Sequence, residues 1–178
     1  MKALAAAIAV LALSGCGEAA RSAQPTEPAS TAYSAHGLTA ALPPGWQHAT
    51  TRLTTITEPV DVLSVGTFPL RYRPVGCNHM PSSALLDLGP DDALVTIFER
   101  ANGSVAGFPP RPEHFGPTPQ DGSEAPECVP PARFTDHWFT FSDAGRYFHV
   151  LVAFGPSTSA KTQAQAWGIL DGLRVGRG

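Results

Sequence analysis

Short stretches in which apolar positions alternate with polar ones, or gather with β-branched residues, are typical of strands. Leu38, Ala40 and Leu42 show this alternation, and Pro43-Pro44-Gly45 then predicts a turn. We expect strands over residues 38–42, 50–57, 60–68 and 91–99. Between the last two, residues 82–88 predict a short helix.

A hairpin and a helix are predicted later in the chain. The apolar stretches 134–141 and 147–154 flank Ser142–Arg146, and about five residues that include Asp and Gly suit a hairpin connection. Residues 158–173 predict a helix, which Ser157 or Ser159 can cap. Its apolar stripe follows helical spacing: Ala160, Ala164, Trp167, Leu170 and Leu173.

These elements together predict an α+β domain over residues 34–178, in which a mainly antiparallel sheet is packed by a long C-terminal helix. The chain has 178 residues, of which 43% are hydrophobic, and this is enough for one domain with a core. Adjacent strands joined by short connections favour antiparallel pairing, and the Trp167 stripe would face the sheet. Residues 102–131 predict a long proline-rich region without regular structure.

The first residues have the pattern of a secretory signal. Met1-Lys2 is followed by an apolar run from Ala3 to Leu13 and then by small residues. As a helix this run would reach roughly 16 Å, about half of the hydrocarbon core of a bilayer, so a permanent span is not expected. Leu13-Ser14-Gly15-Cys16 resembles the lipobox of bacterial lipoproteins.

That resemblance implies that residues 1–15 form a lipoprotein signal peptide and that Cys16 is lipidated and becomes the first mature residue. Two or three acyl chains on one residue give stable anchoring, because each buried CH2 contributes about 0.8 kcal/mol. We therefore expect a palmitate-bearing protein on the cell membrane or the outer membrane, lipid-anchored and extracytoplasmic. Residues 16–33, which have almost no large apolar side chains, would form a flexible tether.

The two ends of the expected domain carry a second resemblance. A strand followed by Pro-Pro-Gly-Trp at 43–46, and a closing helix that ends Trp-Gly-Ile-Leu-Asp-Gly-Leu at 167–173, look like the PsbP/Mog1-like sandwich found in secreted bacterial lipoproteins. The resemblance covers only these two ends of the chain. It implies an α+β sandwich and carries no catalytic residues with it.

Two cysteines remain if Cys16 is acylated, and an oxidising compartment would allow Cys77 and Cys128 to form a disulfide. Such a bridge would stabilise the fold by roughly 4 kcal/mol in the loop-entropy model and would hold the proline-rich region in place. The alternative is a free thiol for catalysis or metal binding. The sequence contains no Cys-x-x-Cys motif, and the residues around Cys128 offer nothing that would lower a thiol pKa, so this alternative has little support.

The six histidines, His36, His48, His79, His114, His137 and His149, have no compact metal-binding spacing. With a free Cys77, three of them could still converge on zinc or copper: His79, His114 and His137. His137 and His149 lie on the two strands of the predicted hairpin and could face each other. The sequence also lacks a serine-hydrolase elbow, a phosphate-binding loop and a dinucleotide fingerprint, so we expect neither a catalytic residue nor a cofactor.

The charge and the aromatic residues limit which partners the protein can be expected to bind. A formal net charge of −3 leaves no basic field for nucleic acid. Aromatic residues gather late in the chain, and any excess on an outer face would bind an envelope protein or a small apolar ligand. The sequence thus favours a membrane-anchored, non-enzymatic binding or accessory protein of the cell envelope. The alternatives are a small metal-dependent or hydrolytic enzyme that uses histidines near the proline-rich region, and a structural accessory of a larger membrane complex.

Overall fold

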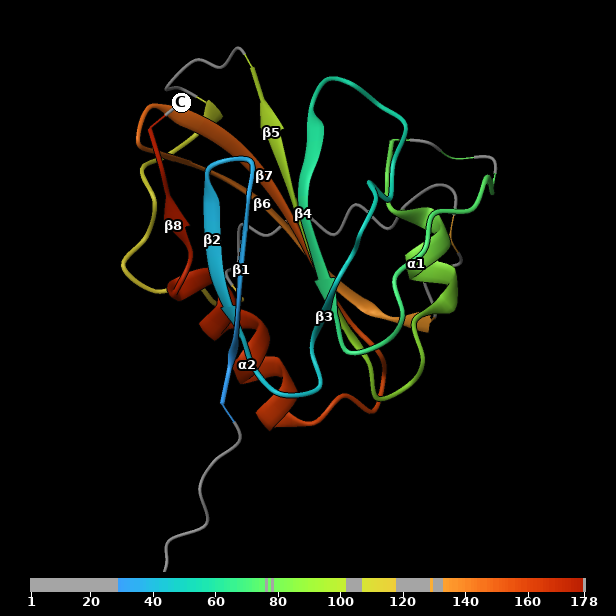
Figure 1. Cartoon of the computed structure of the whole chain (residues 1–178). Helices are drawn as coiled ribbons and strands as arrows, with labels where there is room; N and C mark the ends of the chain where they lie inside the picture. The colour runs from blue at the N-terminus through green and yellow to red at the C-terminus, as the bar shows by residue number, and fades with distance from the viewer. Residues whose placement is uncertain are drawn as a thin grey trace, which may run out of the picture.

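The described part of the chain is an α+β fold of two antiparallel sheets and two helices (Figure 1). The computed structural model describes residues 29–75, 77, 79–101, 107–117, 129 and 133–177. One sheet has three strands in the order β1 (Thr31–Ala35), β2 (Leu38–Leu42), β8 (Arg174–Val175). The other has five, in the order β3 (Gln47–His48), β4 (Val60–Gly66), β5 (Ala93–Arg100), β7 (Arg146–Phe154), β6 (Thr135–Asp143). The helices are α1 (Ser82–Asp87) and α2 (Ala160–Asp171).

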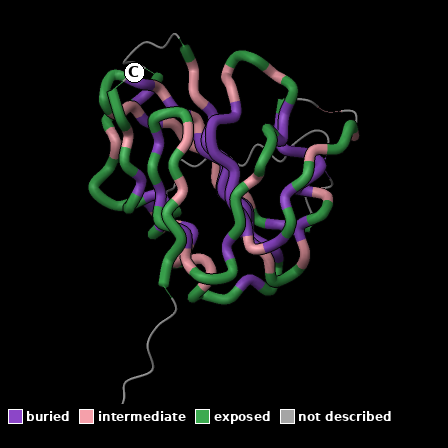
Figure 2. Tube along the Cα trace, in the orientation of Figure 1, coloured by how far each residue is buried: buried purple, intermediate pink, exposed green. Residues whose placement is uncertain are grey.

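The five-stranded sheet is buried on both faces, because alternate residues of its central strands enter two different cores. On β7, Val150 and Val152 pack with residues of α2 and of the three-stranded sheet, while Leu151 and Ala153 pack with residues of α1. Figure 2 shows the buried positions running along these central strands. A sheet covered on both faces reads as a nearly continuous apolar run, which is why 91–99 and 147–154 were recognisable as strands.

Both hairpins turn through two residues with positive φ. His36 (51°) and Gly37 (71°) join β1 to β2, and Ala144 (52°) and Gly145 (79°) join β6 to β7. Two positive φ values are the signature of the type I′ turn, whose twist matches that of the strands. The predicted connection Ser142–Arg146 is therefore wrong in length, because β6 continues to Asp143 and β7 begins at Arg146.

The strand predicted over 50–57 is wrong. Ala49, just before this segment, donates from its backbone N to Ser64 O at 2.8 Å, and the chain then leaves the strand ladder. Leu53 N instead donates to the Asp61 carboxylate at 2.8 Å. The β-branched residues of this segment therefore do not form a strand, because the Asp61 side chain of β4 takes the place of a strand partner for the Leu53 N–H.

The predicted tether boundary at residue 33 is too late. Strand β1 begins at Thr31, and its Cα register pairs Thr31 with Leu42 and Tyr33 with Ala40. The strand was missed because β1 is an edge strand whose positions are exposed or half-buried, so its small and polar residues carry no apolar alternation.

Helix α2 was predicted in the right place but not with the right length, and its core face was predicted only in part. It has 12 residues rather than being long, and Ser159 caps it by accepting a hydrogen bond from Thr162 N at 3.1 Å. Of the predicted stripe, Leu170 and Leu173 are buried and Trp167 is half-buried against the core, whereas Ala160 and Ala164 are exposed. The buried face consists of Ala166, Ile169, Leu170 and, just beyond the helix, Leu173. No helix among the described residues is long and apolar enough to cross a membrane.

A single arginine joins the two sheets. Arg146, at the start of β7, is 8% exposed and binds both carboxylate oxygens of Glu99 on β5, at 2.6 and 2.7 Å. The same guanidinium donates to His36 O at 2.8 Å in the β1–β2 turn and lies 3.4 Å from Gly176 O beyond β8. Glu99 holds the guanidinium in place, and the guanidinium's contacts with these two carbonyl groups connect the three-stranded sheet to the end of the five-stranded one.

Candidate functional site

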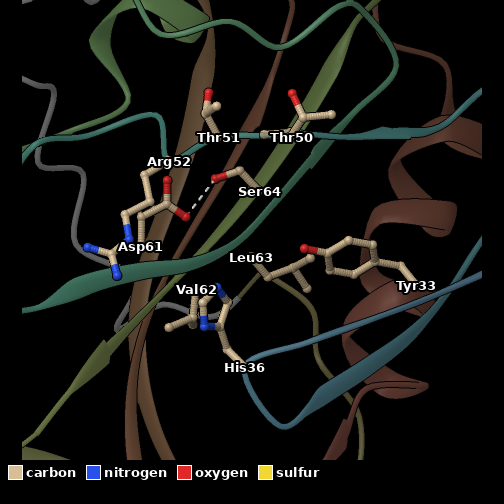
Figure 3. A pocket seen from close by; sticks show the side chains of 10 residues that line it. Tyr33, His36, Thr50, Thr51, Arg52, Asp61, Val62, Leu63 and Ser64 are labelled. Atoms are coloured by element: carbon tan, nitrogen blue, oxygen red, sulfur yellow. Dashed lines mark hydrogen bonds between the residues drawn. The ribbon is translucent and has the colours of Figure 1, made fainter.

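The candidate site is a hollow of about 190 Å³ between the β1–β2 hairpin and the outer part of the five-stranded sheet. Three segments line it: the hairpin, the irregular chain after β3, and β4. The lining residues are Tyr33, His36, Ala49, Thr50, Thr51, Arg52, Asp61, Val62, Leu63 and Ser64. Figure 3 shows Asp61, Ser64 and Arg52 on one side of this space, with Tyr33 and His36 approaching it from the hairpin.

Asp61 is the fixed group of the site. Asp61 is only 3% exposed, and its two carboxylate oxygens accept hydrogen bonds from different groups. Leu53 N donates to Oδ2 at 2.8 Å, and the Ser64 hydroxyl donates to Oδ1 at 3.1 Å. The Ser64 oxygen also lies 3.2 Å from Thr96 Oγ1 on the neighbouring strand. Asp61 is thus a buried acid held by a short hydrogen-bonded chain, with lone pairs left on both oxygens.

An irregularity in β4 places these polar groups on one face. The register shifts between Asp61 and Leu63, so that Asp61 pairs with Phe98 while Ser64 pairs with Thr96. Phe98 and Thr96 are two apart on β5 and share a face, so the extra residue in β4 brings Asp61 and Ser64 to that face together. Bulges of this kind commonly redirect side chains beside functional sites.

Burial raises the pKa of Asp61 above its ordinary value, while the hydrogen bonds from Leu53 and Ser64 and the nearby charges of Arg52 and His36 act in the opposite direction. Desolvation also raises the pKa of Tyr33, and the negative charge of Asp61 adds to that rise. The Tyr33 ring lies 4.5 Å from the His48 ring, centroid to centroid. The site therefore offers a buried acceptor, several hydroxyl groups and an exposed guanidinium around one small space.

A second hollow, of about 540 Å³, lies where the end of β2 meets α2. It is lined by Ser30, Ala41, Pro43, Pro44, Gln165, Gly168 and Ile169. None of these side chains is ionisable, and Gln165 already accepts a hydrogen bond from Trp46 Nε1 at 3.2 Å. Its chemistry is therefore poorer than that of the Asp61 hollow, which we take as the site.

The structure describes only one of the three cysteines singled out in the sequence. Cys16 and Cys128 lie outside the described residues, so the lipidation of Cys16 and the Cys77–Cys128 pairing stay predictions. Cys77 itself is disulfide-bonded, which does not favour the alternative of a free metal-binding or catalytic thiol. Most of the proline-rich region 102–131 also lies outside the description.

The histidines do not converge. His137 pairs with Val152 and contacts the rings of Phe154 and Trp167 on the α2 side, whereas His149 pairs with Thr140 on the opposite face of the sheet. The expectation that these two histidines face each other is therefore wrong. His114 is exposed and lies 3.3 Å from Asp171. Among the described residues, no three histidine, cysteine, aspartate or glutamate side chains are placed to hold a metal ion.

The late aromatic residues are part of the two cores. Phe141, Phe148 and Phe154 belong to the core that includes α2, and Phe134 to the core that includes α1. The half-buried ones are packed against these cores or against other rings: Trp138, Phe139 and Tyr147. The outer patch considered from the sequence is therefore not formed by these residues.

Sequence reasoning named His36 among the histidines but missed the other residues of the Asp61 site and the hollow itself. One signal was present, because Asp61 is the only charged residue within the apolar strand Val60–Gly66, and buried charges need partners. Comparisons of the chain with protein-family models, with curated proteins and with solved structures found no match. The resemblances to the lipobox and to the PsbP/Mog1-like sandwich therefore depend on their own motifs.

Proposed function

We propose that this protein is a lipid-anchored, extracytoplasmic binding protein of the cell envelope. Cys16 carries the acyl chains, a tether follows, and the α+β domain binds a small polar ligand in the Asp61 hollow. The observation that carries the anchor is Leu13-Ser14-Gly15-Cys16 behind the apolar run 3–13. The α+β sandwich implied by the PsbP/Mog1-like resemblance, and a Cys77–Cys128 bridge, belong to the same proposal.

The place of the hollow in the domain suits this arrangement. The tether would join the domain at the start of β1, and residues 17–28 can span at most about 40 Å. The hollow is lined by Tyr33, in the middle of β1, and by His36, at the turn into β2. A ligand could therefore approach on the side away from the anchored end.

A binding role is favoured over catalysis by what holds Asp61. Both of its carboxylate oxygens are already engaged, by Leu53 N and by the Ser64 hydroxyl. A carboxylate fixed in this way keeps one geometry and can accept a further hydrogen bond from a ligand. The remaining polar groups at the hollow, on Tyr33 and Arg52, are suited to hydrogen bonding with the same ligand.

Replacing Cys16 by serine tests the anchor. We expect the wild-type chain in the membrane fraction of its native host, resistant to a high-salt wash, and the Cys16→Ser chain in the aqueous fraction, because the acyl chains supply the membrane affinity. Fractionation followed by immunoblotting measures this. The matched control is Cys128→Ser, which removes a different cysteine and should stay with the membrane. A Cys16→Ser chain that remains in the washed membranes would refute the lipid anchor.

A further inference from the structure

Residues 107–117, which we call the strap, cross the edge of β6 from one face of the five-stranded sheet to the other. Backbone bonds hold the strap to the edge at Ser142: Arg111 N donates to Ser142 O at 2.9 Å, and Ser142 N donates to Pro109 O at 2.7 Å. Side-chain bonds run from Thr140 Oγ1 to Gly107 O at 2.9 Å and from Ser142 Oγ to Phe108 O at 3.1 Å.

The two ends of the strap are held in different ways. On the α2 side, the Arg111 guanidinium donates to Leu170 O and Leu173 O, both at 2.6 Å, and Phe115 packs in the core. On the other face, Phe108 is 7% exposed and is the apolar contact of the strap. Its ring lies edge-on to His149, with centroids 5.0 Å apart, and 5.3 Å from the Tyr147 ring.

His149, whose ring contacts that of Phe108, has no polar partner for its imidazole in the described part of the chain. Both of its ring nitrogens are buried, and neither has a hydrogen-bond partner among the residues that the structure describes. A neutral imidazole tolerates this setting at a cost, but an imidazolium would bring two buried N–H donors and a charge with nothing to receive them. Charging His149 therefore opposes the closed position of Phe108.

The surrounding charges reinforce this bias. Arg100 of β5 faces His149 on one side, and Glu58, which could stabilise a positive charge, lies 3.6 Å from the Arg100 guanidinium and is exposed to water. The neighbours on β6, Trp138 and Thr140, carry no charge, and Tyr147 is the titratable group beside His149 on β7. Desolvation, followed by the charge of Arg100, lowers the pKa of His149 below its ordinary value.

We propose that His149 is an acid-sensitive latch that keeps the Phe108 end of the strap closed while its imidazole is neutral and releases that end when the imidazole is protonated. The release is local, because the Arg111 and Phe115 end makes no contact with His149 and stays attached to α2. Opening uncovers the rings that Phe108 contacts, those of Tyr147 and His149. At the cell surface, such a latch would respond to external acidification.

Proton linkage determines in which direction pH shifts the opening of the strap and over which pH range it does so. Because the pKa is lower with the strap closed than in the open state, the open state binds more protons, and opening becomes more favourable as pH falls below about 6.5. The opening constant can rise by at most tenfold per pH unit and levels off below the pKa of the closed form. Above this range the latch is closed and insensitive to pH.

Amide hydrogen exchange, corrected for intrinsic rates, measures the latch in the full chain held in detergent micelles. The amide of Ser142, which donates to Pro109 O, reports on the Phe108 end of the strap, that of Arg111 on the attached end, and that of Val152 in the central sheet on global unfolding. We expect protection at Ser142 to fall several-fold between pH 7.5 and 5.5, while protection at Arg111 falls less and protection at Val152 does not change. In His149→Phe the Ser142 amide should show no such fall.

His114→Gln is the matched control, because His114 lies in the strap but faces Asp171 at its other end. This variant should keep the wild-type pH response. The proposal is overturned if protection of the Ser142 amide in the wild-type chain does not depend on pH, if that amide loses protection equally in His149→Phe, or if Val152 loses protection with it. Should His149→Phe not fold, the imidazole resonances of His149 in the wild-type chain must titrate together with strap protection.

Discussion

Replacing Arg146 by methionine is expected to lower the free energy of unfolding by about 2–3 kcal/mol, because the ion pair with Glu99 is partly buried and hydrogen bonds to charged groups contribute roughly that much. Methionine fills part of the space but leaves the Glu99 carboxylate without its bidentate partner. His36 O also loses its donor, so the three-stranded sheet is no longer held at this point. Urea unfolding at neutral pH measures the loss.

Arg174→Met is the control for this experiment, because Arg174 is an exposed arginine of β8 and should change the unfolding free energy by less than about 0.5 kcal/mol. The double variant Arg146→Met/Glu99→Gln should be less destabilised than the sum of its parts, since it no longer contains an unpaired carboxylate. A loss of under about 1 kcal/mol in Arg146→Met would show that the contacts of this guanidinium do not hold the two sheets together.

Two substitutions of Asp61 are expected to differ sharply in how far they lower the free energy of unfolding. Asp61→Ala leaves the Leu53 N–H and the Ser64 hydroxyl without their acceptor and should cost about 1–3 kcal/mol. Asp61→Asn keeps an acceptor for Leu53 and should be close to wild type at neutral pH, because it also removes a buried charge. Equal destabilisation by alanine and asparagine would show that the charge, rather than the hydrogen-bonded tie, matters for the fold.

The pH dependence of the wild-type chain relative to Asp61→Asn follows from the raised pKa of Asp61. The folded carboxyl binds its proton more readily than the unfolded one does, so the folded state gains stability as pH falls from neutral through the folded pKa towards about 4. Urea midpoints at several pH values should therefore shift in favour of the wild type as the solution is acidified. A constant difference between the two chains would contradict the burial of this group.

Strands with two buried faces were predictable from the sequence, and strands with a weak apolar pattern were not. The strands around Val95 and Val150 have nearly continuous apolar sequences, because both faces of the sheet are covered. By contrast, β1 contains small polar residues and is stabilised by its pairing with β2, a contact that no local pattern encodes. The stretch around Leu53 has strand-forming residues, but the carboxylate of Asp61 takes its backbone N–H out of the ladder.

The candidate site was hidden for a related reason. Tyr33, Arg52 and Asp61 come from three separate segments, and only the fold brings them to one hollow. The bulge that turns Asp61 and Ser64 to the same face depends on the pairing of β4 with β5. The sequence shows an acid in an apolar strand, but neither its partners nor the space beside it can be inferred without the tertiary structure.

The central claim is that acyl chains on Cys16 hold this domain at a membrane outside the cytoplasm. The most direct measurement is mass spectrometry of the full-length product isolated from native membranes after metabolic labelling with palmitate. We predict a mature chain that begins at Cys16 and carries labelled acyl groups on its N-terminal peptide. A membrane-isolated chain with an unmodified Cys16, or with no label in that peptide, would contradict the account.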